Sequence, residues 1–228
     1  MMSSAEQSES QGVIDAVRGT VLHLARPVHT MLRRRKLALL FQFMGDASES
    51  TLLDVGGATG ISLEFVPLYR AFRDVAVVNL TAPPLSEVSL PNVRYDIADG
   101  CSLPYPAKSF DWVFSNAVIE HVGGQHRQQQ FADEIRRVAR KGYFVTTPNR
   151  SFPIEPHALL PFYQFLPESL QRKVVRFSPG YLKHYEEIHL LSARRLRQLF
   201  PDAIIRSTGF PLVGTSLVAM YKDSSLAV

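Results

Sequence analysis

Residues 52–60 read Leu52-Leu53-Asp54-Val55-Gly56-Gly57-Ala58-Thr59-Gly60, an apolar run that leads directly into a cluster of small residues. The apolar run is typical of a buried strand, and the small residues after it let the chain turn sharply into a helix. Such a turn lets a ligand approach the main chain, and the helix start offers unpaired N–H groups. An acidic residue two positions before the first glycine would repel a pyrophosphate but suits a positively charged ligand. The stretch therefore predicts a strand–turn–helix unit that binds a cationic cofactor.

The spacing of this turn differs from that of two other glycine-rich turns. Ala58 stands at the second place of a G-x-G-x-x-G pattern and Ile61 at the third. No Gly-Lys-Ser/Thr comes after it, as a phosphate-gripping loop would require. The turn is therefore neither the usual dinucleotide fingerprint nor a nucleotide triphosphate loop.

Short apolar runs and longer helical patterns alternate after this turn. Strands are expected at 51–55, 75–80, 93–97, 112–115, 142–147, 203–207 and 216–221, and helices at 61–72, 125–140 and 192–200. Ser192 is the expected N-cap of the last of these helices. The alternation predicts an α/β fold: a Rossmann-like, seven-stranded, mostly parallel sheet with helices on both faces. The short connection between the last two runs predicts an antiparallel final strand.

The remaining segments complete a four-part organisation. Residues 1–45 hold a frayed tail to about Gln11, a helix from Val13, and a second helix at 28–43 that begins after an interruption at Pro27. Residues 46–150 form the cofactor-binding core, 151–190 a helical aromatic cap, and 191–228 a helix and strand pair that complete the core. The run Arg33-Arg34-Arg35-Lys36 is either a solvated helix face or a clamp for an anionic substrate or lipid headgroup.

Composition narrows the class of protein. The chain has 228 residues, 46% hydrophobic and 20% charged, which is typical of a globular protein. One cysteine excludes an intramolecular disulfide framework and points to a reducing compartment. No run approaches the roughly 20 apolar residues of a membrane span, and no secretory signal is visible. We therefore expect a cytoplasmic protein, with contact at a membrane surface and the oligomeric state left open.

Several motifs in one order resemble the class I S-adenosylmethionine-dependent methyltransferases, in the small-molecule, type 11-like branch. The glycine-rich stretch is similar to their D-x-G-x-G-x-G signature. Ile97-Ala98-Asp99-Gly100-Cys101 comes after the third strand, Ser109-Phe110-Asp111-Trp112-Val113 resembles the S-F-D-x-V lead into the fourth, and Ser115 to Val122 resembles its end. The resemblance implies S-adenosylmethionine as cofactor.

The resemblance also implies roles for individual residues. Asp54, Gly56, Gly57 and Gly60 would hold the amino-acid end of the cofactor, Asn79 the ribose and Asp99 the adenine, and Asn116 is a further cofactor-binding candidate. Relatives carry an acidic residue at the second strand's end. An amide there can still hydrogen-bond a diol, but without the strength of a carboxylate.

Some relatives carry E-x-x-E-H at the end of the fourth strand, which would imply a divalent metal. This chain has Ala117 at the first of these places and keeps only Glu120 and His121. Two neighbouring ligands do not make a site, so we expect no metal. His121 is the candidate catalytic base because imidazole titrates near neutral pH. The alternative is a structural histidine that caps the next helix.

The stretch T-P-N-R-x-x-P-I-E-x-H comes after the fifth strand and contains the candidate substrate-binding residues Asn149, Arg150 and His157. A structural turn built on the prolines is an equal alternative. The aromatic residues between Phe152 and Phe177 are either core or a shelter for an apolar acceptor.

The function that these patterns predict is methyl transfer from S-adenosylmethionine to a small-molecule acceptor by in-line displacement. They do not say whether oxygen, nitrogen or carbon is methylated. The alternative is a catalytically inactive scaffold that binds the cofactor. Nucleic-acid methylation draws on the sequence pI of about 9.3, but the chain lacks an N/D-P-P-Y/F motif after the fourth strand. We therefore expect no nucleic-acid partner.

Overall fold

The computed structural model of the chain describes residues 4–57, 65–81, 90–210 and 213–226. The chain divides into two compact units, which we describe separately. The helical unit comprises residues 1–32 and 150–187, and the sheet unit comprises residues 33–149 and 188–228.

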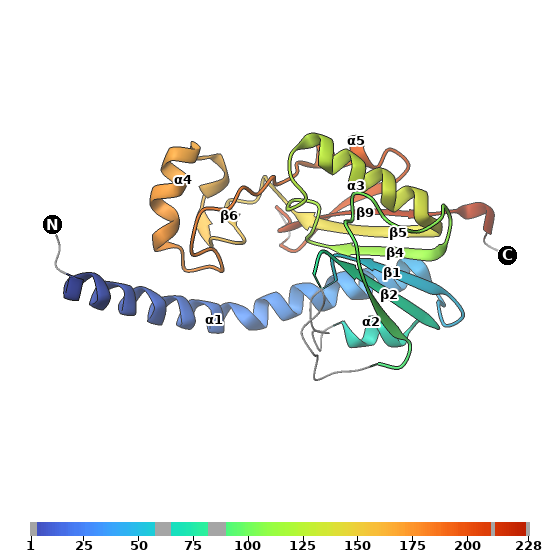
Figure 1. The fold of residues 1–228 in the computed structure, drawn as a ribbon, viewed down its shortest axis with the longest axis horizontal. Coiled ribbons are helices and arrows are strands. Elements are labelled where there is room, and N and C mark those ends of the chain that lie inside the picture. Colours follow the sequence, from blue (N-terminus) through green and yellow to red (C-terminus); the bar gives the residue numbers. More distant parts are fainter. Residues whose placement is uncertain (1–3, 58–64, 82–89, 211–212, 227–228) are drawn as a thin grey trace. The chain divides into compact units, whose positions relative to one another are not determined.

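The sheet unit is built on one seven-stranded sheet (Figure 1). Its strands are β1 (Thr51–Val55), β2 (Asp74–Asn79), β3 (Val93–Ile97), β4 (Phe110–Asn116), β5 (Ala139–Pro148), β8 (Ile204–Thr208) and β9 (Ser216–Lys222), in the spatial order β3-β2-β1-β4-β5-β9-β8. The first five pair in parallel, and β9 is antiparallel to both β5 and β8. The predicted fold class and the antiparallel final strand are confirmed.

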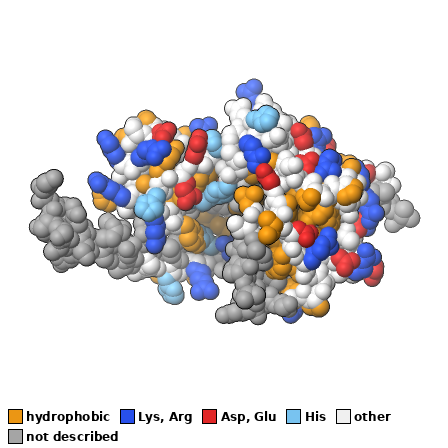
Figure 2. All heavy atoms as spheres, in the orientation of Figure 1, with side chains coloured by type: hydrophobic (Ala, Val, Ile, Leu, Met, Phe, Trp, Pro, Cys, Tyr) orange, Lys and Arg blue, Asp and Glu red, His pale blue; other side chains and the backbone are white. Residues whose placement is uncertain are grey.

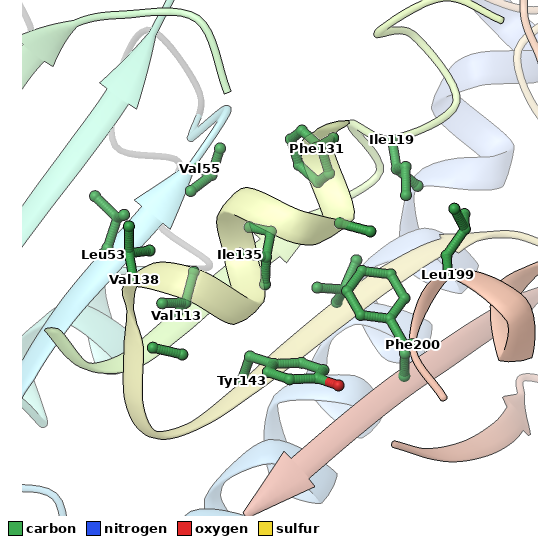
Figure 3. Close-up of a cluster of buried hydrophobic side chains, with 14 of the residues drawn as sticks. Leu53, Val55, Val113, Ile119, Phe131, Ile135, Val138, Tyr143, Leu199 and Phe200 are labelled. Atoms are coloured by element: carbon green, nitrogen blue, oxygen red, sulfur yellow. The ribbon is translucent and has the colours of Figure 1, made fainter. Parts of the chain in front are cut away.

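Helices α3 (Gln125–Val138) and α5 (Ala193–Leu199) cover one face of this sheet. Alternate strand residues such as Leu53 and Val113 point to that face, as the two-residue period of a strand requires. They pack against Phe131 and Ile135 of α3 and Leu199 of α5, all fully buried (Figure 3). Burial of this apolar surface, at about 25 cal/mol per Å², is the main force that closes this face.

The opposite face is covered by α2 (Val66–Arg70) and by the last turns of α1, which spans Ser4–Met44. Leu37, Leu40 and Met44 recur at helical spacing and pack with Leu52 and Phe114 of the sheet. Just before them, Lys36 reaches the end of β4. This part of α1 therefore extends to the carboxyl edge of the central strands, where open α/β sheets bind ligands.

The helical unit contains the first part of α1 and a compact segment after β5. That segment holds β6 (Ile154–Glu155), β7 (Leu160–Pro161), η1 (Tyr163–Phe165), α4 (Glu168–Val174) and η2 (Val175–Phe177). The buried Glu155 carboxylate accepts hydrogen bonds from the main-chain N–H groups of His157 and Ala158, which closes the turn between the two short strands.

Two of the predicted helices can be compared directly with the structure. The helix at 192–200 is confirmed as α5, and its N-cap Ser192 accepts a hydrogen bond from the Arg195 N–H at 3.2 Å. The helix predicted at 61–72 corresponds to α2, and residues 61–64 lie outside the described residues.

The segment at 151–190, predicted to hold helices rather than strands, does contain helices, but it also forms the antiparallel pair β6 and β7. The Phe162 N–H donates to the Pro153 carbonyl and extends this pair by one hydrogen bond.

The interruption predicted at Pro27 is wrong, and so is the frayed tail as far as residues 4–11 are concerned; residues 1–3 lie outside the described residues. One helix runs from Ser4 through Pro27 to Met44. Proline removes one hydrogen bond, to the carbonyl of His23, and both residues are exposed, so water can satisfy that carbonyl. The Ser, Glu and Gln residues near the start tolerate helical backbone at small cost.

No helix in the described part of the chain combines the length and apolar character that a membrane crossing requires.

Candidate active site

A cavity of about 310 Å³ opens in the sheet unit at the carboxyl ends of β1 to β4. It is lined by Val55, Gly56, Val78, Asn79, Leu80, Ala98, Asp99, Gly100, Ala117, Val118, His121, Val122, Arg127 and Phe131. Its volume lies at the lower end of the range for small-molecule sites, and a few polar side chains interrupt an apolar wall, as such sites usually show. Four of the residues predicted to bind or react lie on this wall: Gly56, Asn79, Asp99 and His121.

The turn after β1 requires glycine at two positions. Gly56 has φ +76°, and its N–H donates to the Val78 carbonyl at 2.8 Å. A Cβ there would lie 2.5 Å from Cγ2 of Val118, and a Cβ on Gly57 would lie 2.5 Å from Cγ1 of Val77. The backbone therefore approaches its neighbours more closely than any side chain permits. Gly60, the third predicted glycine, lies outside the described residues.

Asp54 lies behind this turn and does not line the cavity. Its buried carboxylate accepts a hydrogen bond from the Tyr69 hydroxyl at 2.5 Å, and its Oδ2 would be 2.9 Å from a Cβ on Gly57. Burial raises the pKa of Asp54 to about 7, although the hydrogen bond from Tyr69 opposes this shift. In the structure Asp54 thus supports the turn from below, and its predicted role toward the cofactor stays a prediction.

Asn79 ends β2 and ties two loops together. Its Nδ2 donates to the Gly57 carbonyl at 2.9 Å, and its Oδ1 accepts from the Leu80 N–H at 2.8 Å. An amide can do both because it has donors and acceptors, whereas an ionised carboxylate could only accept. The residue that departs from the family's acidic pattern therefore has a structural use here, on the wall of the cavity.

Asp99 is paired with a residue that the sequence motifs did not indicate. Its Oδ2 accepts from Nη2 of Arg127 at 2.6 Å, and its Oδ1 accepts from the Cys101 N–H at 2.9 Å. Partial burial opposes ionisation, but these hydrogen bonds together hold the pKa of Asp99 below its usual value. Arg127 lies in the first turn of α3, 28 residues further on, and no local pattern marks it.

The end of β4 carries a second polar group, outside the cavity wall. Asn116 Oδ1 accepts from Lys36 Nζ at 3.0 Å and from the Thr146 hydroxyl at 2.8 Å. Asn116, predicted to bind cofactor, therefore faces α1 and β5. Ala117 comes next, in the left-handed region at φ +57°, which turns the chain so that Val118 packs over Gly56.

His121 lies on the cavity wall beyond this turn and is exposed. Its Nε2 is 4.0 Å from Oε1 of Glu120, whose side chain is fully buried and whose Oε2 accepts from the Thr147 hydroxyl at 3.0 Å. A carboxylate beside an imidazole stabilises the imidazolium that forms when the ring accepts a proton.

The three predicted substrate residues are distributed over both units. Asn149 belongs to the sheet unit, is buried, and donates from Nδ2 to the Gly214 carbonyl at 2.9 Å. Arg150 and His157 belong to the helical unit. The Arg150 guanidinium lies 5.5 Å from the centre of the Phe165 ring, and Nδ1 of His157 is 2.6 Å from a Glu155 oxygen. Their role toward a substrate stays a prediction.

Comparison with known proteins agrees with this geometry. A family model described as a methyltransferase domain matches residues 53–146, which include the turn after β1, Asp99 and the end of β4. No curated protein sequence matches the chain.

Three solved structures illustrate the shared fold. Magnesium protoporphyrin IX methyltransferase from Synechocystis PCC 6803, with bound S-adenosylhomocysteine, is 13% identical, with a TM-score of 0.57 over 90% of this chain and 87% of that one. A methyltransferase from Aquifex aeolicus is 16% identical, with a TM-score of 0.50 over 81% and 88%. Phosphoethanolamine N-methyltransferase 2 from Haemonchus contortus, in complex with S-adenosyl-L-methionine, is 19% identical, with a TM-score of 0.51 over 76% and 38%.

The chain therefore carries a methyltransferase domain over residues 53–146, and its fold is that of solved S-adenosylmethionine-dependent methyltransferases. It is a methyltransferase, and S-adenosylmethionine is its cofactor. The cavity fits this group: its lining includes Gly56 of the glycine turn, and Asn79 and Asp99 lie on its wall next to an apolar surface that includes Phe131. Amide and carboxylate groups beside an apolar wall suit a nucleoside.

Proposed function

We propose that this methyltransferase acts on a small-molecule acceptor and that His121 receives the proton which the acceptor loses. The observation that carries the proposal is the position of His121, exposed on the wall of the cavity beside the end of β4. A base must reach both the acceptor and the transfer position, and the carboxyl edge of the sheet is where both would meet.

The surroundings of His121 support this role. The buried Glu120 carboxylate at 4.0 Å would stabilise the imidazolium, and the Thr147 hydroxyl holds that carboxylate in place. The His121 N–H donates to the Val118 carbonyl at 2.8 Å, which closes a turn and holds the main chain at this point. A positioned base of this kind typically contributes about 100-fold to 10,000-fold in rate.

The reaction has a simple balance. When bound, S-adenosylmethionine supplies a methyl group made electrophilic by the neighbouring sulfonium. The acceptor's lone pair would take up this methyl group, S-adenosylhomocysteine would be the leaving group, and the acceptor's proton would pass to His121. The residues of this chain contribute by aligning the partners and by limiting water around them.

The charges on one face of the sheet unit also support a small acceptor over a nucleic acid. On the face of the sheet unit drawn in Figure 2, Lys and Arg side chains are interspersed with Asp and Glu. Nucleic-acid binding usually relies on a continuous basic stripe that neutralises several phosphates. A cytoplasmic location is part of the same proposal, and the single, buried Cys101 is compatible with it.

The test is to incubate the full chain with S-adenosylmethionine and separate pools of small molecules, RNA and proteins, and to measure S-adenosylhomocysteine by mass spectrometry. We expect product with at least one pool of phenols, sugars, lipid-like or amine metabolites. Turnover with RNA or protein alone would contradict the proposal.

Once an acceptor is identified, His121→Ala should lower kcat about 100-fold while the affinity for S-adenosylhomocysteine changes little. The matched control is His126→Ala, which removes an exposed histidine outside the cavity wall. A structural histidine would behave differently. Equal losses of turnover and cofactor affinity, with a lowered melting temperature, would show that His121 only supports the fold.

A further inference from the structure

The basic run of α1, residues 33–36, has members on different sides of the helix, some facing solvent and one facing the sheet. Arg34 and Arg35 are exposed, whereas Lys36 is partly buried and directs its ammonium to the sheet. Its Nζ donates to Oδ1 of Asn116 at 3.0 Å, where β4 ends. The inner member of the run therefore reaches the edge of the sheet at which methyl transfer takes place.

The orientation of Asn116 is determined by two donors. Its Oδ1 accepts from Lys36 Nζ and, at 2.8 Å, from the hydroxyl of the buried Thr146 on β5. Both hydrogen bonds would be lost if the amide turned over. Its Nδ2 group, with two N–H donors, is therefore held on the side away from both partners.

No carboxylate oxygen of the described residues lies within ion-pair distance of Lys36 Nζ, and the buried Glu120 attracts this charge only from further away. Burial, with a smaller effect of Arg33 one turn earlier, lowers the pKa of Lys36 to about 8, and the more distant Glu120 opposes this. Buried charges in proteins are usually paired. A lysine ammonium has three N–H donors, and one hydrogen bond to a neutral amide uses only one of them.

We propose that Lys36 and the Nδ2 group of Asn116 form a binding site for an anionic oxygen, a carboxylate or phenolate, of the methyl acceptor. This inference rests on the proposed function and gives its acceptor a chemical class: small molecules that carry an acidic group. The cofactor's own carboxylate has the same chemistry, so the experiment must separate the two sources.

The test compares three variants with the wild-type chain. Lys36→Met removes the charge and keeps the length of the stem, and Lys36→Arg keeps the charge. Arg35→Met is the matched control, because it removes a charge from the exposed face of the same helical turn. Melting temperatures establish that each variant folds. The structure predicts that Lys36→Met melts at the wild-type temperature or above, since it removes a poorly solvated charge.

The main readout is affinity-selection mass spectrometry on protein saturated with S-adenosylhomocysteine. The probes are a panel of small aromatic and aliphatic carboxylic acids and phenols, each with its neutral amide or methyl ether. We expect the wild type, Lys36→Arg and Arg35→Met to bind the acids more tightly than their neutral counterparts. In Lys36→Met, the ratio of acid binding to neutral-compound binding should fall at least tenfold. Absence of acid preference in the wild type, or the same preference in Lys36→Met, would overturn the inference.

A second measurement identifies the source of the anion. Calorimetry compares S-adenosylhomocysteine with 5′-methylthioadenosine, which lacks the carboxylate. Equal effects of Lys36→Met on both ligands support the acceptor site. A tenfold loss for S-adenosylhomocysteine alone would assign the site to the cofactor and overturn our assignment. Because the readout is binding, it stays interpretable even if the proposed methyl transfer to small molecules fails.

Discussion

Two charged side chains at the carboxyl edge of one sheet have opposite surroundings. Asp99, after β3, has a guanidinium at 2.6 Å and a main-chain N–H at 2.9 Å. Lys36, on α1 beside the end of β4, has one neutral amide oxygen at 3.0 Å. The first charge is balanced within the fold and serves to hold the loop. The second has no ion-pair partner among the described residues and is attracted only by the more distant Glu120, so its desolvation is a stability cost that an anionic ligand can reduce.

Asp54 is a third charged residue to compare with Asp99 and Lys36. The fold buries its carboxyl group, and burial favours the neutral, protonated form. The pKa of Asp54 is about 7 in the folded chain and near 3.8 when unfolded. The folded state thus holds the proton more tightly, so the stabilising contribution is complete below pH 3.8 and is lost as pH rises through about 7. Over that window the loss could reach about 4 kcal/mol, at about 1.4 kcal/mol per pH unit.

The largest expected effect therefore belongs to Asp54→Asn, which keeps an acceptor for Tyr69 but cannot ionise. Without cofactor, its free energy of unfolding should fall less than that of the wild type between pH 4 and 8, so that it is the more stable protein at pH 8. Urea unfolding at a series of pH values measures this. Asp74→Asn, at an exposed carboxylate, is the control. Parallel curves for wild type and Asp54→Asn would contradict the assigned burial cost.

An intermediate effect is expected when the balanced pair is broken. Arg127→Met should cost about 1 kcal/mol of unfolding free energy at low salt and less at high salt, because both side chains are more than one third exposed. It should also weaken S-adenosylhomocysteine binding several-fold, since Asp99 and Arg127 both line the cavity.

This prediction is checked by chemical unfolding at two salt concentrations and by calorimetry, with Arg194→Met on α5 as an exposed control. In a double-mutant cycle, Arg127→Met should cause almost no further loss of unfolding free energy in a chain that already carries Asp99→Asn. An undiminished cost of Arg127→Met in that background would mean that the guanidinium acts through other partners.

The smallest expected effect on stability follows from removing the charge of Lys36. Lys36→Met is expected to raise the unfolding free energy at pH 7 by roughly 0.5 kcal/mol, a small gain because the removed charge is only partly buried and its hydrogen bond to Asn116 is lost with it. The pKa of Lys36 is lowered to about 8, so its stabilising contribution is present above pH 10.5 and is lost as pH falls through about 8. The advantage of the variant should therefore shrink above pH 8. A destabilised Lys36→Met at pH 7 would show that the lysine anchors α1.

Regular elements were predictable where one local pattern governs them. The parallel strands correspond to short apolar runs, and α5 corresponds to Ser192 and the periodicity after it. The continuity of α1 through Pro27 was not predictable from the local rule, because the penalty of a proline depends on whether water reaches the carbonyl four residues earlier. That depends on exposure, which is a property of the folded chain.

Of the candidate site, the chain order of the motifs was enough to predict that Gly56, Asn79, Asp99 and His121 lie together, because parallel strands bring their carboxyl ends to one edge. Only the tertiary structure paired Asp99 with Arg127, turned Asn116 to Lys36 and placed Asp54 behind the turn. These contacts join residues 15 to 80 positions apart, and they depend on which face of a strand or helix each side chain occupies. Local sequence patterns determine the path of the backbone, because each pattern involves residues that are close together in the chain. Side-chain partners are determined by how helices and strands pack against one another, and these elements lie far apart in the sequence.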